Sequence, residues 1–136
     1  MKAIGTNIQG EKIEFDCENG YLWCYNRELT SLIIPMGVMR VFCYDNQITE
    51  LTVPEGVKEV YCYDNQLKEL IIPMGVTIVS CWNNQLTELI IPEGVTYVSC
   101  SHNQLTHLSL PDSIRYLHAD KKVTGLEKHI GKVDIE

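Results

Sequence analysis

Residues 29–47 read LTSLIIPMGVMRVFCYDNQ, and shifting the chain by 19 positions superimposes this stretch on three near-identical copies. The copies are ITELTVPEGVKEVYCYDNQ (48–66), LKELIIPMGVTIVSCWNNQ (67–85) and LTELIIPEGVTYVSCSHNQ (86–104). A fifth copy, LTHLSLPDSIRYLHADKK (105–122), is one residue short after Ala119, and a sixth begins as VTGL (123–126). A short fixed period predicts a solenoid in which each repeat forms one coil and packs on its neighbours.

Apolar residues keep fixed positions inside each copy. Val57, Val60 and Cys62 alternate with variable residues, which is the period of a β-strand. An asparagine follows where a turn needs a side chain that satisfies backbone groups, at Asn46, Asn65, Asn84 and Asn103. A Pro-x-Gly turn then reverses the coil, with its glycine at Gly37, Gly56, Gly75 and Gly94. No segment has a helical period with caps, so we expect little or no α-helix.

This pattern resembles the leucine-rich repeat, Leu-x-x-Leu-x-Leu-x-x-Asn-x-Leu, and here reads Val57-x-x-Val60-x-Cys62-x-x-Asn65-x-Leu67. The short period and the Leu-x-x-Leu-x-Ile-Pro segment are similar to the repeats of YopM-like and IpaH-like bacterial effectors, over about residues 20–126. The resemblance implies a β-rich coil or horseshoe with a parallel β-sheet on its concave face. The sequence has neither the helical leader nor the ligase domain of those effectors, so we do not expect their enzymatic activity here.

The repeat boundaries divide the chain into three parts. Residues 1–20 are expected to form an N-terminal cap with a degenerate first repeat, whose first half is KIEF (12–15). The repeats extend over 21–126, and 127–136 are expected to cap the other end, with Lys128 and Lys132 in water. Caps are needed because an end coil has only one neighbour against which to bury apolar side chains.

Five of the six cysteines occupy one inward position of the repeat, at Cys24, Cys43, Cys62, Cys81 and Cys100. We expect a row of small packed residues, continued by Ala119. Disulfides are disfavoured because in-register parallel side chains seldom reach the required torsion, and zinc because a linear row is not a tetrahedron. Cys17 lies outside the row and is expected to be the most reactive thiol or simply a part of the cap. We expect no metal and no cofactor.

The net charge of −7 disfavours nucleic acids and anionic membranes as partners. The amino terminus has no apolar run of secretory length, and no later segment is long enough to span a bilayer. We therefore expect a reducing cytoplasm, or export without a classical signal peptide.

Outward positions of the expected strands carry most of the aromatic residues. One column reads Trp23, Phe42, Tyr61, Ser80, Ser99 and His118, and the next reads Tyr25, Tyr44, Tyr63, Trp82, Ser101 and Asp120. A third column holds Tyr21, Tyr97 and Tyr116, with Arg40 and Glu59 between them. We define the aromatic surface as the seven rings of the first two columns: Trp23, Tyr25, Phe42, Tyr44, Tyr61, Tyr63 and Trp82.

Two interpretations of the aromatic surface, and a variant of one of them, stay open. The rings could stabilise the sheet by cross-strand stacking, which is common among aromatic residues in strands. They could instead bind a protein partner, since tyrosine and tryptophan dominate interface energetics; self-association through the same face is the variant. Acidic flanks at Asp45 and Asp64, and an acidic rim expected at Glu50, Glu69 and Glu88, would favour a basic partner.

A second apolar set lies near the Pro-x-Gly turns, and we name it the Ile/Met ridge: Ile33, Met36, Ile71, Met74 and Ile90. The intervening repeat has Thr52 and Glu55 instead. If these side chains project outward they form a candidate contact for a homodimer; alternatively they fold into the stack.

Catalysis has little support in the sequence. His102 and His118 fall near Cys100, but a nucleophilic thiolate must be exposed beside its imidazole, and Cys100 belongs to the inward row. The leading prediction is a non-enzymatic protein-binding module, and its sharper version is a small effector or inhibitor that blocks its partner. A structural or self-associating repeat protein without a dedicated ligand is the alternative.

Overall fold

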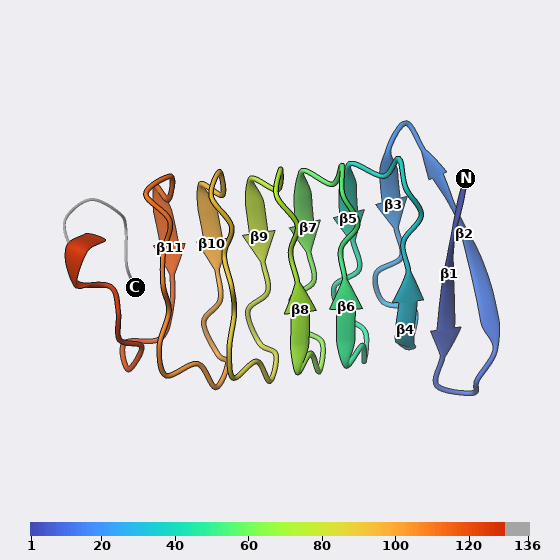
Figure 1. Cartoon of the computed structure of the whole chain (residues 1–136). Helices are drawn as coiled ribbons and strands as arrows, with labels where there is room; N and C mark the ends of the chain where they lie inside the picture. Colours follow the sequence, from blue (N-terminus) through green and yellow to red (C-terminus); the bar gives the residue numbers. More distant parts are fainter. Residues whose placement is uncertain (130–136) are drawn as a thin grey trace.

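A computed structural model describes residues 1–129 of the chain, apart from the side chain of Lys128. Most of the expected C-terminal cap (127–136), including Lys132, therefore lies outside the described residues, as does the predicted exposure of Lys128. In the described part the chain winds into a stack of coils joined by β-strands (Figure 1). The secondary structure described contains one short 3-10 helix, Glu127–His129, and no α-helix.

One strand from each coil joins a long parallel sheet. In spatial order these strands are β3 (Tyr21–Trp23), β5 (Arg40–Phe42), β7 (Glu59–Tyr61), β9 (Ile78–Ser80), β10 (Tyr97–Ser99) and β11 (Tyr116–His118). Val41 pairs with Val60, and Val60 with Val79, so each partner lies one repeat of 19 residues away. The sequence period is thus the register of the sheet, and we call its outer surface the sheet face.

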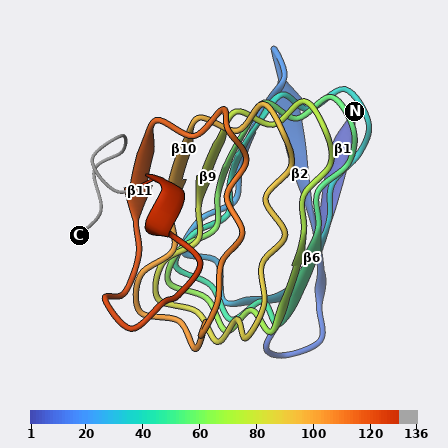
Figure 2. The same cartoon turned by 60° about the vertical axis from the view of Figure 1, so that its left-hand side comes forward.

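A second strand lies on the other side of some coils. β4 (Leu29–Ile33) pairs with the N-terminal hairpin, whereas β6 (Glu50–Thr52) and β8 (Glu69–Ile71) pair with each other in parallel. Figure 2 shows β6 across the coil from β9, β10 and β11. We call this side the back face, and the buried residues lie between it and the sheet face.

The interior consists of the apolar positions that the repeat predicts. In one repeat, Cys43 and Ile48 are fully buried and Leu51 and Val53 are each 2 % exposed. Burying each large apolar side chain contributes roughly 1.5–3 kcal/mol. Each side chain contacts equivalents above and below, so this stabilisation exists only when neighbouring coils are present.

The asparagines connect successive coils as well as turning the chain. The Asn46 Nδ2 amide donates to the backbone carbonyls of Cys24 and Cys43, each at 3.0 Å, while its Oδ1 accepts from the amide of Leu29 at 3.0 Å. The later asparagines repeat the pattern and are likewise buried: Asn65, Asn84 and Asn103. An asparagine is required here because one side chain must both donate and accept.

The Pro-x-Gly turns have the predicted geometry. Gly56 and its equivalents have φ values of 97–100°, a region that side-chain-bearing residues rarely occupy. In the fifth copy Ser113 replaces the glycine, and its hydroxyl accepts from the amide of Gly94 at 2.9 Å and donates to the carbonyl of Val95 at 2.8 Å.

Residues 1–20 form an antiparallel hairpin rather than any part of a coil. β1 (Lys2–Asn7) pairs with β2 (Lys12–Glu18), and β2 and β1 then pair antiparallel with β3 and β4 respectively. The hairpin therefore covers the open edge of the first coil on both faces (Figure 1). The interpretation of KIEF (12–15) as half of a repeat is wrong, because these four residues pair antiparallel with residues 3–6 of the same hairpin.

Candidate functional site

The sheet face carries the aromatic surface. Trp23 pairs in register with Phe42, and Phe42 with Tyr61, so their side chains project from the same side. Trp23 is 52 % exposed and Tyr25 43 %, and the other five rings are partly buried. The predicted columns therefore exist, and all seven rings lie outside the core.

Within each column the rings stack face to face. Trp23, Phe42 and Tyr61 have successive ring centroids 4.0 and 5.0 Å apart, with interplanar angles of at most 5°. In the second column the spacings from Tyr25 through Tyr44 and Tyr63 to Trp82 are 4.9, 4.6 and 4.7 Å. Stacked pairs of this kind contribute about 0.5–1.5 kcal/mol each beyond the area they bury. The rings thus stabilise the sheet and at the same time form a continuous outer surface.

Two charged residues lie beside the first column. Arg40 comes two residues before Phe42 in the sequence, and Glu59 two residues before Tyr61. The Arg40 guanidinium forms an ion pair with the Glu59 carboxylate and donates to the hydroxyl of Tyr21. The Tyr61 hydroxyl donates to the same carboxylate at 2.6 Å. Burial alone would raise the pKa of Glu59, but the hydrogen bonds from Tyr61 and Arg40 hold this pKa below its usual value. Burial and the bond to Glu59 raise the pKa of Tyr61 to about 12, so this tyrosine stays neutral.

The acidic groups near the aromatic surface are fewer than predicted. Asp45 and Asp64 do follow its second column, with φ values of 61° and 52°, where short polar side chains tolerate the left-handed backbone. The expected rim is wrong: Glu50 belongs to β6 and Glu69 to β8, on the back face, and Glu88 lines a back-face pocket with Glu69. The chain has already turned to the back face at these positions, because each coil has two sides.

The C-terminal half of the sheet face is hollowed. Here Ser80, Ser99 and Ser101 occupy positions that hold rings in earlier coils. A hollow of about 510 Å³ results, and it is lined by Trp82, Asn83, Tyr97, Ser99, Ser101, His102 and His118. The sequence indicated the change from large to small side chains, but we did not predict a hollow there.

Asp120 does not continue the second column as predicted. Its Oδ1 accepts from the backbone amide of His102 at 3.0 Å and its Oδ2 from that of Asn103 at 3.4 Å. The residue missing after Ala119 shifts the turn, so a carboxylate accepts backbone hydrogen bonds at the end of the asparagine row. Its side chain is therefore directed at the preceding coil.

The thiols of the inward row are shielded from solvent. All six cysteines are free and buried. Burial raises the pKa of Cys24 and Cys100 to about 12, and it also raises the pKa of the three thiols between them well above the ordinary value: Cys43, Cys62 and Cys81. Cys100 beside His102 and His118 is thus a protonated core residue and not a nucleophile. Cys17 is also buried, 6 % exposed, and its thiol donates to the carbonyl of Phe15 at 3.7 Å.

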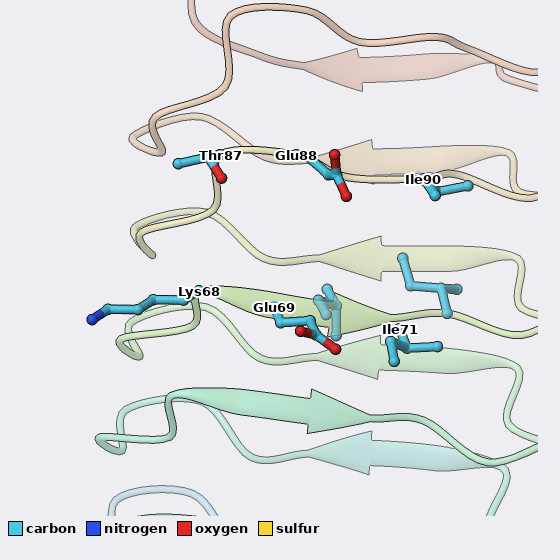
Figure 3. A pocket seen from close by; sticks show the side chains of 8 residues that line it. Lys68, Glu69, Ile71, Thr87, Glu88 and Ile90 are labelled. Carbon is cyan, nitrogen blue, oxygen red and sulfur yellow. The ribbon is translucent and has the colours of Figure 1, made fainter.

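The Ile/Met ridge projects into solvent on the back face. Ile90 is 77 % exposed, Ile33 and Met36 are each 66 % exposed, and Met74 is 65 % exposed. Ile71 and Ile90 also line a pocket of about 450 Å³ between β8 and the next coil (Figure 3). Residues 88–90 form no strand, so the pairing of β6 with β8 stops there and leaves this gap.

These features define the class: the chain has the fold of a leucine-rich-repeat solenoid, with a 19-residue coil, a parallel sheet and an asparagine row. Among solved structures it is similar to the leucine-rich-repeat domain of a Shigella effector, at a TM-score of 0.52 and 16 % identity, over 86 % of this chain and 80 % of that one. No protein-family model and no curated protein sequence matches. At such identity the likeness establishes the fold, and it confirms the predicted resemblance to effector repeats at that level.

Within residues 1–129, no group of three or more histidine, cysteine, aspartate or glutamate side chains is arranged to hold a metal ion. That part of the chain also has no helix of the length and hydropathy needed to cross a membrane.

Proposed function

We propose that the chain is a non-enzymatic protein-binding module that holds its partner on the aromatic surface. The observation that carries this proposal is the pair of ring columns, which present seven stacked aromatic side chains on one side of a rigid sheet. Stacking fixes the rings in the free protein, so a partner meets a preorganised surface and loses little entropy in ordering it. Leucine-rich-repeat folds serve widely as scaffolds for protein interaction, which supports the same conclusion.

The partner that this surface suits best presents a basic patch. Asp45 and Asp64 lie beside the second column, and the whole chain carries a net charge of −7. Opposite charge speeds association, and a lysine or arginine over an exposed ring gains a cation–π interaction. A module that covers a partner in this way acts as a small effector or inhibitor by blocking the partner's own surface. The six free thiols fit work in a reducing compartment.

The alternative is a self-associating protein without a dedicated ligand, in which the rings only stabilise the sheet. The exposed Ile/Met ridge favours this alternative, because contiguous exposed apolar side chains often mark interfaces. In that case two copies would meet through their back faces and form a homodimer.

Affinity capture with matched variants tests the proposal. The immobilised chain is incubated with native-cell or host extract, and the affinity of any captured protein is then measured with purified components. We expect Tyr44→Ala with Tyr63→Ala to raise Kd at least about 30-fold, the effect of losing roughly 2 kcal/mol at a hot spot. Ile71→Ser with Met74→Ser, on the back face, should leave Kd unchanged.

The opposite pattern contradicts the proposal. Binding that survives loss of the two tyrosines but not of the ridge residues would assign the interface to the back face. Thermal unfolding of each variant accompanies the capture, because removal of stacked rings lowers stability somewhat. If the tyrosine variant unfolds, the single change Trp23→Ala, at the exposed end of its column, replaces it.

A further inference from the structure

The second ring column ends abruptly at Trp82. From Tyr25 to Trp82 each ring stacks on the next at 4.6–4.9 Å, which is close to the spacing of neighbouring strands. The next residue of the column is Ser101, whose side chain carries no ring. Among the described residues Trp82 stacks on Tyr63 alone, and its indole also lines the hollow. One position of the stack is thus vacant beside an indole ring.

The rest of the hollow has the shape and chemistry of a binding site. Tyr97, held by stacking on Tyr116 at 4.6 Å, forms another part of its lining. Ser99 also lines it and is only 4 % exposed, and its hydroxyl forms no hydrogen bond with any other described residue. The oxygen of this hydroxyl is not fully buried, so it can bind water in the free protein and exchange that water for a polar group of a ligand. The volume of about 510 Å³ lies within the usual range for ligand pockets, about 300–1,000 Å³.

We propose that this hollow receives one aromatic side chain, a tyrosine or tryptophan, of the protein partner, which stacks on Trp82 over Ser101. This inference rests on the proposed function and specifies one contact within it. The incoming ring completes the column as its next member, and its polar group, a phenol hydroxyl or an indole N–H, pairs with the hydroxyl of Ser99. Tyrosine and tryptophan suit such a site because each joins an apolar ring to one hydrogen-bonding group.

The lining argues against an arginine in the same place. A guanidinium would also stack on an indole, but it carries a charge and five donors and needs carboxylate or carbonyl partners. No carboxylate is among the described residues that line the hollow, and two of its members are histidines, His102 and His118. Basic groups of the partner therefore belong beside Asp45 and Asp64, and the ring belongs in the hollow.

The two tryptophans of the chain make a direct test possible, because Trp23 and Trp82 give separate indole N–H signals in a 1H–15N NMR spectrum. N-acetyl-tyrosinamide and N-acetyl-tryptophanamide are titrated as probes, with N-acetyl-argininamide and N-acetyl-leucinamide as comparisons. We expect the aromatic probes to shift the Trp82 signal saturably, with Kd of about 1–10 mM, at which a single side chain would bind. The Trp23 signal should move much less.

The substitution Ser101→Tyr places a ring of the chain itself at the vacant position of the column. The same position holds a tyrosine in three earlier coils, Tyr25, Tyr44 and Tyr63, so the variant should fold and stack its own ring on Trp82. We expect it to lose at least 90 % of the aromatic-probe response. Ser109→Tyr, an exposed serine on the back face, is the matched control and should keep the full response.

Each outcome decides the proposal. No saturable shift with the aromatic probes, or an equal shift with Ser101→Tyr, overturns it, and tighter binding of the arginine probe assigns the hollow to a cation instead. With a partner in hand, Ser101→Tyr should weaken capture at least tenfold. If capture is unchanged by Ser101→Tyr but lost with Tyr44→Ala and Tyr63→Ala, the proposed function stands and the role of the hollow fails. Probe binding without any partner capture supports the hollow as an aromatic site but contradicts the binding of a protein there.

Discussion

At the scale of single residues, the strands of the long sheet and the residues that directly follow them divide their side chains between the core and the outer surface. Cys43 and Cys62 point into the stack and are fully buried, whereas Tyr44 and Tyr63, the next residues along, lie on the sheet face. Alternation along a strand makes this separation possible, since neighbouring residues project to opposite sides. Core packing and the outer surface therefore depend on different residues of the same segment.

The row of buried thiols makes the free energy of unfolding depend on pH in the alkaline range. Burial raises the pKa of five thiols above the ordinary value of 9.0, so they stay protonated in the folded chain and ionise in the unfolded chain above about pH 9. Their contribution is complete below that pH and is lost as pH rises toward the folded pKa. We expect the free energy of unfolding to be flat with respect to these groups below pH 9 and then to fall by about 1.4 kcal/mol per pH unit for each thiol.

Urea unfolding followed by circular dichroism between pH 8 and 10.5 measures this dependence. Cys62→Ala is the matched variant, because Ala119 already occupies the same position in the last coil. It should reduce the slope above pH 9 by about 1.4 kcal/mol per pH unit. Stability that does not change between pH 8 and 10.5 would show that the thiols ionise freely and are not buried.

At the scale of the coil, the turns and the asparagines set its shape. Gly56 has a φ of 97° with nothing within 4 Å of the position that a Cβ would take, so backbone conformation alone demands glycine there. Asn65 on the opposite turn donates to the backbone carbonyls of Cys43 and Cys62, which directly follow the strands of two successive coils. Each coil is therefore closed by two turns that tolerate few other residues.

Gly56→Ala tests whether the turn conformation itself matters. We expect it to lower the free energy of unfolding by about 1–3 kcal/mol, the usual cost of forcing a side chain into this region of φ. The neighbouring change Glu55→Ala should alter it by less than about 0.5 kcal/mol. Equal effects of the two changes in chemical denaturation would show that the turn can relax, and that glycine is not required.

The sequence predicted the elements that repeat and failed where the repeat ends. Register, inward cysteines and ring columns all follow from a 19-residue period, because every coil meets the same constraints. The N-terminal hairpin lies before that period, and KIEF was misassigned for this reason. Glu50 and Glu69 were misplaced because periodicity does not tell which side of a coil a residue faces. The hollow arises from the combination of Trp82 in one coil with Ser99 and Ser101 in the next, so only the folded structure reveals it.

For the whole molecule, stacking makes stability a property of neighbouring coils. Residues 48–66 contact the coils before and after them through equivalent positions, such as Val60 with Val41 and Val79. The interfaces on the two sides are nearly interchangeable, because the repeats share their inward residues. Such arrays behave approximately as sums of coil and interface contributions.

Deletion of a complete repeat should therefore preserve the fold. Without residues 48–66, Val41 would meet Val79 in the same register, and we expect cooperative unfolding at a lower denaturant midpoint with a smaller m-value. Deletion of residues 48–57 removes fewer buried apolar side chains, namely Ile48, Leu51, Val53 and Val57, but it breaks the 19-residue register and should abolish folding. A folded half-repeat deletion would contradict the stacking of equivalent positions.

The central claim is that a partner binds the outward rings of the long sheet. Hydrogen–deuterium exchange of the chain, free and in complex with its captured partner, tests this claim most directly. We expect binding to slow exchange over residues 21–26, 40–45, 59–64 and 78–83, which comprise four strands of the long sheet and the residues after them that carry the second ring column. Protection confined to residues 69–74 and 88–93, on the back face, would contradict it.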